Sequence, residues 1–387
     1  MRKIIYINSK INSFLIVVSI IFCAHLKAQT PSFANETEVT INGLTFDAME
    51  PHLSADGNAL FFNSLNDGIT TSLYYAGKIN DSVFNFIGLV PMVNQTVSPR
   101  LDGVASIDTS NNFYWVSTRN YPNDNLHRIR FLTSSYTNFG LVHGDFYIHG
   151  PGWLIMDAAV NHYGDKLIYC NAWFNSCLGG APCIASMGIA QKVNDSIFNK
   201  MPNSDAWFAN INDTTNYIVY APFLSKDELE LYYTRLLKNG TQTEIMVATR
   251  ASVNAPFGTP ALLISAPSVL PEGPALTSDQ TKMYYHKKVG ATFKLFYQTR
   301  VETTKLSELK YETHFLISPN PANTEITISN LPAHEKYETV IYTSLGQVVF
   351  TSKNEDKINI STLENGIYIL KITTDSGTNA KFKIVKE

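Results

Sequence analysis

The 387-residue sequence contains few charged residues and no segment in which one sign of charge dominates. Charged residues make up 16% of the chain, and the formal net charge is −3. A basic run or an acidic tail is absent, which argues against nucleic acid and anionic membrane surfaces as partners. Long apolar stretches are also lacking after the N-terminal segment, so we expect no transmembrane segment in the mature chain.

The N-terminal segment has the features of a secretory signal peptide. Three basic residues precede an apolar run, Phe14–Ala24, that is too short to span a bilayer as a mature helix. We predict that residues 1–28 are a signal peptide and that the mature chain is exported. Lipid attachment at Cys23 is the alternative, although the bulky Phe22 occupies the position where a lipoprotein signal has a small residue.

Cysteine is scarce, with four in the chain, of which Cys170, Cys177 and Cys183 follow the predicted cleavage point. An exported protein meets an oxidising compartment, where one disulfide is expected. Cys177 and Cys183 bracket a segment rich in turn-forming residues and are the preferred pair. Cys170 with Cys183 across a hairpin is the alternative. The paired CxxC motifs and flanking His of zinc modules are absent, so we expect no metal and no cofactor.

The aromatic content favours a chain built from strands. The sequence has 22 Phe, 20 Tyr and 4 Trp, among scattered Gly, Pro, Asn, Asp and Ser. Aromatic residues are enriched in strands, and the small polar residues form the turns between them. The mature chain is longer than one compact core usually serves. We predict an all-β fold with a large domain followed by a small one.

A repeated unit organises the middle of the chain. Its clearest copy is Glu50–Phe62, in which a short strand leads through Ser-Ala-Asp-Gly into a second, apolar strand. Similar units begin at Tyr220 and Gly273, and two weaker ones at Ser106 and Val160. In such a turn Asp can bond its own backbone, and Gly tolerates a positive φ. A unit that recurs about every 50 to 65 residues indicates an array of small sheets.

These units resemble the TolB-type, WD-like propeller repeat, whose signature is a Pro-x-x-Ser-x-Asp-Gly turn leading into a hydrophobic strand. The resemblance covers residues 36–300 and implies a β-propeller. Five copies imply five blades, and a sixth, poorly marked blade between Ile184 and Tyr220 is the alternative. Val39–Phe46 precedes the first unit and is expected to complete the sheet of the last one, which would leave no open edge.

Residues 314–387 form a separate segment after a polar linker, residues 301–313. Short stretches in it alternate apolar and polar residues, as in the strands of a small Ig-like β-sandwich. The segment begins with Ser-Pro-Asn-Pro-Ala and resembles the type A C-terminal sorting domain of the type IX secretion system, the outer-membrane export route of Bacteroidota. The residues that carry this resemblance are Pro319, Asn320, Pro321, Gly346, Gly366 and Tyr368.

The second resemblance implies a destination and a partner. A sorting domain of this type is recognised in the periplasm by the type IX machinery, and it is then removed or used for attachment. The chain would cross the inner membrane by its signal peptide and the outer membrane by the type IX route. We therefore expect the mature protein in the medium or on the cell surface.

Candidate ligand-binding residues lie in the loops that lead into the inner strands, because propellers bind ligands over their central channel. They are Glu50, His52, Arg100, Asp102, Asp157 and Glu272. Four carboxylates near one rim could hold a sugar, a peptide or a cation, or supply the acid and base of glycoside hydrolysis. The preferred interpretation is structural: acidic residues ahead of proline are a habit of TolB-type repeats, in which they cap the strand start and are solvated in the channel. Trp153, Trp173 and Trp207, in or near loops, could stack on a sugar, whereas Trp115 is predicted to be core.

Three functions remain open from the sequence. A glycan- or protein-binding module is preferred, because no motif singles out an acid, a base or a Gly-x-Ser-x-Gly nucleophile elbow. A polysaccharide hydrolase or lyase that uses the rim carboxylates is the alternative. A passive scaffold is the third.

Overall fold

The computed structural model describes residues 30–67, 69–132, 135–175, 177, 181–240, 242–301, 315–330, 336–344, 346–375 and 379–387. The chain divides into two compact units, Met1–Val301 and Glu302–Glu387. Within the described residues, strands make up nearly all regular structure, and the one helix, α1 (Ser204–Trp207), is a single turn. The all-β prediction is therefore confirmed. The predicted signal peptide and nearly all of the predicted linker lie outside the described residues.

No helix in the described ranges has the length and apolar character needed to cross a membrane.

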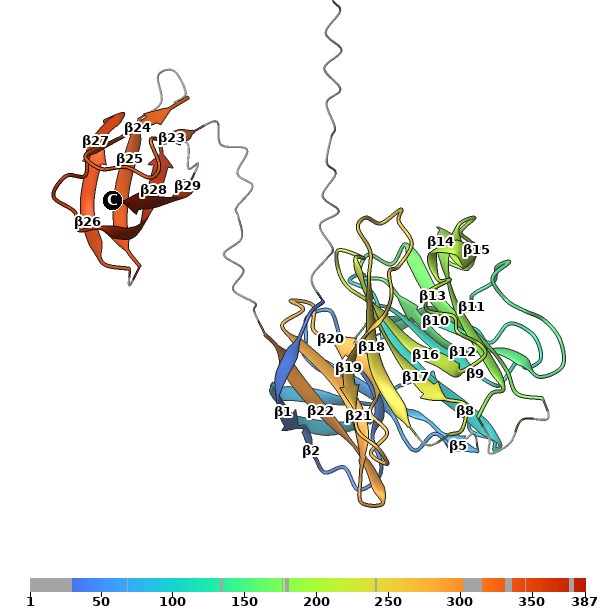
Figure 1. Ribbon diagram of the computed structural model, residues 1–387. Helices are drawn as coiled ribbons and strands as arrows, with labels where there is room; N and C mark the ends of the chain where they lie inside the picture. The colour runs from blue at the N-terminus through green and yellow to red at the C-terminus, as the bar shows by residue number, and fades with distance from the viewer. Residues whose placement is uncertain are drawn as a thin grey trace, which may run out of the picture. The chain divides into compact units, whose positions relative to one another are not determined.

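The first unit is built from five sheets that follow one another along the chain (Figure 1). Sheet 1 contains, in spatial order, β2 (Thr40–Asn42), β7 (Val83–Leu89), β6 (Leu73–Asn80), β4 (Ala59–Asn63) and β3 (Met49–Leu53). Sheet 2 contains β11 (Ser135–Leu141), β10 (Leu126–Leu132), β9 (Asn112–Ser117), β8 (Arg100–Ile107) and β5 (Thr70–Thr71). Sheet 3 contains β12 (Trp153–Val160), β13 (Lys166–Trp173), β14 (Ile184–Asn194) and β15 (Ile197–Lys200).

The remaining two sheets complete the unit. Sheet 4 contains β16 (Tyr217–Leu224), β17 (Glu230–Leu237), β18 (Thr243–Thr249) and β19 (Ala261–Ser265). Sheet 5 contains β1 (Phe33–Glu38), β22 (Thr292–Arg300), β21 (Lys282–Val289) and β20 (Glu272–Leu276). The first strand of each repeat, β3, β8, β12, β16 or β20, contacts the equivalent strands of two neighbouring sheets, and β20 contacts β3. These five inner strands therefore surround one central axis.

The N-terminal strands connect the last sheet to the first. Strand β1 pairs antiparallel with β22 and lies beside it in Figure 1, while β2 pairs parallel with β7 of sheet 1. The segment that completes sheet 5 is thus Phe33–Glu38 rather than the predicted Val39–Phe46. The reason is that the chain leaves sheet 5 at Val39, whose N–H donates to Leu295 O at 2.8 Å, and then crosses to sheet 1.

The repeated turn has the local hydrogen bonds that its sequence favours. Asp56 Oδ1 accepts from the Ser54 hydroxyl at 2.5 Å and from the Asn58 N–H at 3.0 Å, and Gly57 has a φ of +71°. The same hydroxyl-to-carboxylate bond joins Ser225 to Asp227 in sheet 4 at 2.6 Å. Because these bonds span only a few residues, the turn is specified by the repeat itself.

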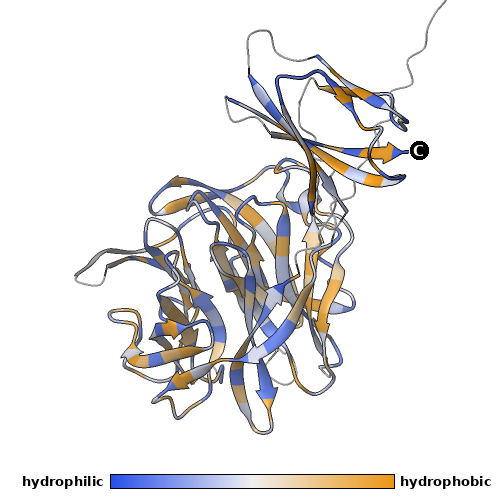
Figure 2. Ribbon diagram, turned by 90° about the vertical axis from the view of Figure 1, so that its left-hand side faces the viewer, coloured by the Kyte–Doolittle hydropathy of each residue, from blue (hydrophilic) through white to orange (hydrophobic). Residues whose placement is uncertain are grey.

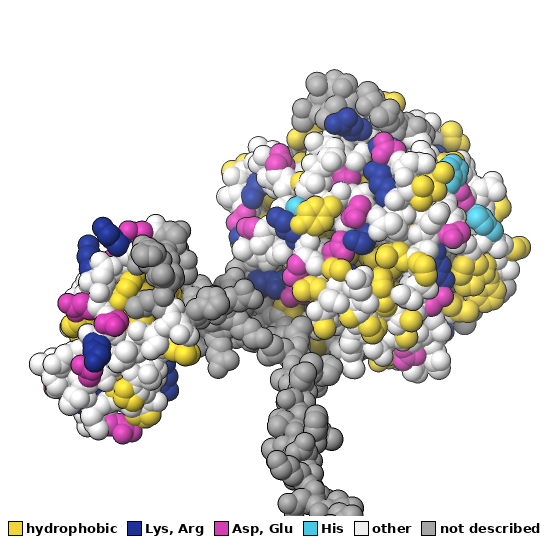
Figure 3. All heavy atoms as spheres, turned by 90° about the horizontal axis from the view of Figure 1, so that it is seen from above, with side chains coloured by type: hydrophobic (Ala, Val, Ile, Leu, Met, Phe, Trp, Pro, Cys, Tyr) yellow, Lys and Arg dark blue, Asp and Glu magenta, His cyan; other side chains and the backbone are white. Residues whose placement is uncertain are grey.

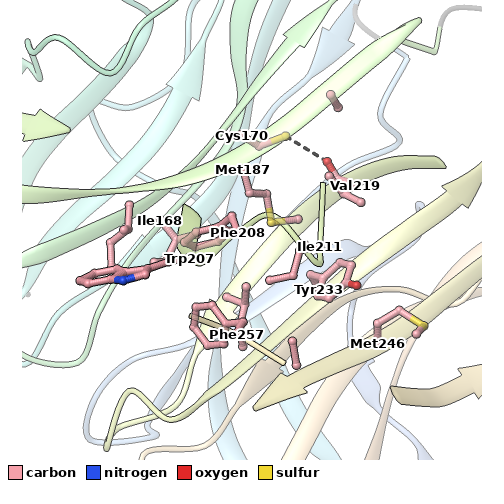
Figure 4. Packing of buried hydrophobic residues seen from close by; sticks show 14 of the residues in the cluster. Ile168, Cys170, Met187, Trp207, Phe208, Ile211, Val219, Tyr233, Met246 and Phe257 are labelled. Atoms are coloured by element: carbon pink, nitrogen blue, oxygen red, sulfur yellow. Dashed lines mark hydrogen bonds between the residues drawn. The ribbon is translucent and has the colours of Figure 1, made fainter. Parts of the chain in front are cut away.

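The core of the first unit lies between neighbouring sheets. Apolar and polar residues alternate along many strands, as the hydropathy colours of Figure 2 show, and the apolar faces pack in several clusters. The largest of these joins sheets 3 and 4 and includes α1 (Figure 4). Burial of these faces is the main force that fixes the inner strands around their axis.

The second unit contains two sheets that share one core. One sheet consists of β23 (Leu316–Ser318), β24 (Glu325–Ser329) and β27 (Lys357–Asn359). The other consists of β26 (Val348–Lys353), β25 (Tyr337–Thr343), β28 (Gly366–Thr374) and β29 (Asn379–Lys386). Buried side chains from both sheets form a single cluster that includes Ile326, Ile358, Ile341 and Leu370.

The sorting-motif residues have identifiable structural roles in this unit. The Asn320 amide donates to Lys383 O at 2.6 Å and accepts from Val385 N at 2.8 Å, which ties the start of the unit to its last strand. Gly346 has a φ of +83°, and Gly366 begins β28. The Tyr368 hydroxyl donates to Glu364 O at 2.9 Å. Pro319 and Pro321 flank Asn320 in the opening turn.

Candidate functional site

The five inner strands share a bulge at the same level of the central axis. The pairing register of each with its neighbour shifts there, as between Met49 and His52 in β3. Glu50, Val104, Ala221 and Gly273 occupy this level in four of the sheets, with φ values of 52°, 57°, 49° and 67°. A bulge bends the strand and changes the direction of its side chains. The positive φ of Glu50 therefore belongs to the repeat and is not by itself a sign of function.

A cavity of about 560 Å³ opens on one side of the bulge level. Its described lining residues are Met49, Glu50, Asn66, Asp67, Leu101, Gly103, Val104, Val116, Ser117, Thr118, Asn125, Leu154, Ile155, Met156, Asp157, Phe174, Ala181, Pro182, Ile218, Tyr220, Leu236 and Glu272. On the other side of the bulge level the described residues line smaller spaces of about 30 and 40 Å³, and a proline from each of three inner strands lines the smaller one. The cavity has a size typical of small-molecule sites. Its inner end lies at the bulge level, where the inner strands leave little space between them.

Four acidic residues line this cavity; Asp67 lies in the loop between β4 and β5, and the other three come from inner strands of three different sheets. Glu50 comes from β3, Asp157 from β12 and Glu272 from β20. Burial, followed by the charges of Asp157 and Glu272, raises the pKa of Glu50 well above its ordinary value of 4.5. Burial and Glu272 raise the pKa of Asp157 from 3.8 to about 7, although the Ala221 N–H opposes the rise. The three groups form one interacting centre, which we call the carboxylate centre.

Two oxygen atoms of the carboxylate centre are buried without a hydrogen-bond partner among the described residues. They are Glu50 Oε2 and Asp157 Oδ2. Asp157 is only 2% exposed, yet it lines the cavity. A buried polar atom without a partner is rare and costly in a folded protein. These two oxygens therefore have unmet hydrogen-bonding capacity beside the cavity.

Tyr220 and His286 lie beside the carboxylate centre. The Tyr220 hydroxyl is hydrogen-bonded to Glu272, and burial together with this carboxylate raises the tyrosine pKa well above 10. The backbone N–H of Glu50 donates to His286 Nδ1 at 3.0 Å, so Nδ1 carries no proton. The other ring nitrogen, Nε2, lies 3.5 Å from Glu272 Oε2 and has no hydrogen-bond partner among the described residues. His286, which is fully buried, thus connects two of the carboxyl residues.

Asp102 is the predicted carboxylate that does not join the others. It is fully buried away from the cavity, where it pairs with Arg119 at 2.8 Å and accepts from Trp115 Nε1 at 3.3 Å. Asp102 precedes the bulge of β8 by two residues, whereas Glu50 and Asp157 lie at it, and strand alternation places the Asp102 side chain inside the sheet packing. Trp115 is core, as predicted. The sequence-based grouping of four rim carboxylates is corrected to three.

His52 and Arg100 also lie outside the carboxylate centre. His52 is buried beyond the bulge level, and its Nε2 accepts from the Ile107 N–H at 3.3 Å. Burial lowers the pKa of His52 to about 4, so the ring is neutral. The Arg100 guanidinium donates to the Ser72 hydroxyl at 3.3 Å. Both side chains connect neighbouring strands and sheets.

The three loop tryptophans do not line the cavity. Trp207 ends α1 and packs in the apolar cluster shown in Figure 4, with only 7% of its surface exposed, so it cannot stack on an external sugar. Its loop position misled the sequence-based prediction because α1 folds back onto sheets 3 and 4. Trp153 and Trp173 are half-buried partners across β12 and β13, and the Trp173 indole donates to Pro151 O at 3.2 Å.

Cys177 and Cys183 form a disulfide, which was the pairing preferred from the sequence. Cys170 is a buried free thiol that donates to Val219 O at 3.1 Å, as Figure 4 shows. The disulfide closes a loop whose Ala181 and Pro182 line the cavity. It therefore holds part of the cavity wall.

Removal of this disulfide should affect ligand affinity as well as stability. The double variant Cys177→Ser/Cys183→Ser is expected to lose about 2 kcal/mol of unfolding free energy, as the chain-entropy model gives for a loop this short. Because Ala181 and Pro182 would lose their anchor, KM or Kd should rise several-fold with little change in kcat. Denaturant unfolding and ligand titration measure both effects. A reductant should lower the stability and ligand affinity of the wild type by the same amounts and leave the double variant unchanged. An unaltered KM in the double variant would show that the disulfide loop does not contribute to ligand binding.

The raised pKa of Asp157 predicts a specific pH dependence of stability. Between pH 3.8 and about 7 the folded state holds a proton that the unfolded state releases, so the free energy of unfolding falls as pH rises through this window. Asp157→Asn removes this pH dependence. The unfolding free energy of the variant minus that of the wild type should therefore be about 2 to 4 kcal/mol larger at pH 8 than at pH 4. Urea unfolding of both proteins across this range measures the difference. If the plots of unfolding free energy against pH ran parallel for the wild type and the variant, Asp157 would have an ordinary pKa in the folded protein.

Comparison with known proteins supports the export prediction. Residues 316–387 match the family described as the secretion system C-terminal sorting domain. The chain carries a type IX sorting domain. This domain marks it as cargo for secretion or display at the cell surface and implies contact with the type IX machinery. A search of curated proteins found no match to the sequence.

Several solved structures are similar to the chain in fold. One is Zg3597, a family 117 glycoside hydrolase from the marine bacterium Zobellia galactanivorans, with 9% identity over 70% of this chain and 90% of that one, at a TM-score of 0.46. TolB from Acinetobacter baumannii has 13% identity over 66% and 55%, at 0.35. Oligogalacturonate lyase from Vibrio parahaemolyticus has 10% identity over 71% and 98%, at 0.33. Likeness at this level does not transfer an activity to this chain.

Proposed function

We propose that this type IX cargo is a glycan-active hydrolase whose first unit is a five-bladed propeller of the TolB-like type, with sheets 1 to 5 as its blades. The second unit would be an Ig-like sandwich that serves export only. The observation that carries the proposal is the convergence of Glu50, Asp157 and Glu272 in one cavity, with two buried oxygens that have no partner among the described residues. Hydrolysis of a glycosidic bond needs an acid and a base or nucleophile of this kind.

The geometry suggests a division of roles within the carboxylate centre. Asp157, with a pKa of about 7, holds its proton at mildly acidic pH and would donate it to the glycosidic oxygen as the bond to the sugar breaks. Glu272, oriented by its hydrogen bond with Tyr220, would take a proton from the attacking water. Glu50, whose pKa is raised by burial and by the charges of Asp157 and Glu272, would hold its proton beside the pair. Water is split between the two products, so the reaction needs no cofactor.

A binding module without turnover is the second candidate, because the same cavity has a mixed apolar and polar lining that suits a sugar. Incubation of the mature chain with a panel of plant, algal and host glycans separates the two. We expect new reducing ends from at least one glycan, and their loss in the Glu272→Gln variant. Retention of a glycan on the protein with no product from any member of the panel would favour the binding module and contradict hydrolysis.

A further inference from the structure

The described lining of the cavity carries charge of one sign only. Glu50, Asp67, Asp157 and Glu272 are acidic, and none of the described lining residues is Lys, Arg or His. The outer surface is different. On the face shown in Figure 3, basic and acidic side chains lie interspersed among apolar and uncharged ones. The absence of cations among the described lining residues is therefore a property of the cavity and not of the chain, whose 30 Lys and Arg nearly balance 33 Asp and Glu.

An anionic ligand would be poorly accommodated in such a cavity. A carboxylate or sulfate group that leaves water must gain a counter-charge or several hydrogen-bond donors, or the transfer costs several kcal/mol. The described lining offers no cationic side chain for this purpose. The charge of Glu272, which raises the pKa values of Glu50 and Asp157, would instead lie near the incoming anion and repel it.

A cationic ligand is not favoured either. Glu50 and Asp157 have raised pKa values because they are buried and close to other acids, so the carboxylate centre carries less negative charge near pH 7 than its three carboxyl groups suggest. Protonated carboxyls donate one hydrogen bond and accept others, as sugar hydroxyls do. Apolar residues such as Leu154, Phe174 and Pro182 provide surfaces for the CH faces of a sugar ring.

We infer that the cavity takes an uncharged carbohydrate and excludes uronic acid and sulfated glycans. This inference rests on the proposed function for its choice of ligand, and it adds the charge class of the substrate. It also argues against a lyase acting on polyuronates, because abstraction of a proton next to a carboxylate needs that carboxylate to be neutralised, and the described lining supplies no cation for this purpose.

The test compares uncharged and anionic glycans as ligands and substrates of the full mature chain. Uncharged oligosaccharides (arabinan, galactan, xylan and glucan fragments) and anionic ones (polygalacturonate, alginate and sulfated galactan fragments) are assayed for binding by calorimetry and for cleavage by product analysis. Oligogalacturonides are included with and without methyl esters, because the ester removes the charge while keeping the ring. We expect at least one uncharged glycan to bind at least tenfold more tightly than every anionic glycan.

Each outcome has a distinct meaning. An uncharged glycan that binds but is not cleaved would support the charge class and contradict the hydrolase. An anionic glycan that is cleaved or bound at least as well as the best uncharged one would overturn the charge class, while leaving hydrolysis in place if cleavage occurs. Failure of every glycan to bind would overturn both.

A pair of variants tests whether the missing positive charge causes the selectivity against anionic glycans. Asn66 is exposed at the edge of the cavity, and its only described hydrogen bond there is from its backbone N–H to Met49 Sδ. Asn66→Lys should raise the affinity for an anionic oligosaccharide by about three- to tenfold over Asn66→Gln, which changes size without charge. Equal affinities for the two variants would show that the missing cation does not set the selectivity.

Discussion

Asn in place of Asp157 is expected to lower kcat on any glycan that the wild type cleaves by about 10²- to 10⁴-fold, the usual contribution of a general acid. The substitution keeps the size of the side chain and the hydrogen bond from the Ala221 N–H, but it removes the transferable proton. KM should change little, because the remaining cavity lining is intact. The measurement is steady-state kinetics of purified mature protein at pH 5 to 8.

The control for this prediction is the same chemical change at an exposed site. Asp205 lies in α1 with its side chain 81% exposed and pairs with Lys200. Asp205→Asn should keep activity within about twofold, since exposed ion pairs contribute little. Asp157→Asn should also be more stable than the wild type at pH 8, as argued above. An Asp157→Asn protein that remains fully active would remove Asp157 from the reaction, whatever its effect on stability.

The second large effect concerns export. Truncation after Val301 is expected to reduce the extracellular protein to background while a folded first unit accumulates in the periplasm. The reason is that the sorting domain, and not the cavity, is the part recognised by the secretion machinery. Fractionation of the native host, followed by immunoblotting of medium, surface and periplasm, measures the distribution.

A point substitution in the sorting domain refines this prediction. Asn320→Ala removes both hydrogen bonds that tie the opening turn to β29, and it should lower the exported fraction with the first unit unchanged. The matched control is Asn359→Ala in β27, an exposed position whose Oδ1 accepts from the Ser361 N–H. For the larger change described above, normal export of the chain truncated after Val301 would contradict the role of the sorting domain.

The parts of the fold that could be predicted from the sequence are those that depend on local interactions. The Ser-x-Asp-Gly turn is specified by bonds between residues two to five apart, as at Ser54, Asp56 and Ala59, so its repetition is visible in the sequence. The path of the closing strand depends instead on pairing between β1 and β22, some 260 residues apart. That choice is decided by packing across the chain ends, and the sequence-based boundary was therefore displaced by several residues.

In the candidate site, too, the residues set by the local repeat could be predicted, whereas those set by contacts between distant parts of the chain could not. The positions of Glu50, Asp157 and Glu272 just before or at the repeated bulge could be read from the repeat, and the structure brings these three together. Tyr220 occupies the position equivalent to Glu272 in its own repeat, so a closer alignment of the copies would have found it. His286 could not be found in this way, because its contact with Glu50 joins residues 236 apart in the sequence.

The error at Asp102 has a physical cause that composition does not reveal. A strand with a bulge changes which residues face the axis, and a shift of one or two positions moves a carboxylate from the cavity into the sheet packing. Asp102 then finds Arg119 and Trp115 as partners and becomes a structural residue. A count of acidic residues near one rim is therefore a weaker indicator than the register of each strand.

The carboxylate centre is tested most directly by infrared titration of protonated carboxyl groups in the mature protein. The coupling of Glu50, Asp157 and Glu272 predicts a protonated-carboxyl band that persists above pH 6 in the wild type, with reduced intensity in Asp157→Asn and in Glu50→Gln. The Asp205→Asn control should retain the band. Loss of all protonated carboxyls by about pH 5, the range of ordinary Asp and Glu side chains, would contradict the coupled centre and the hydrolase proposed from it.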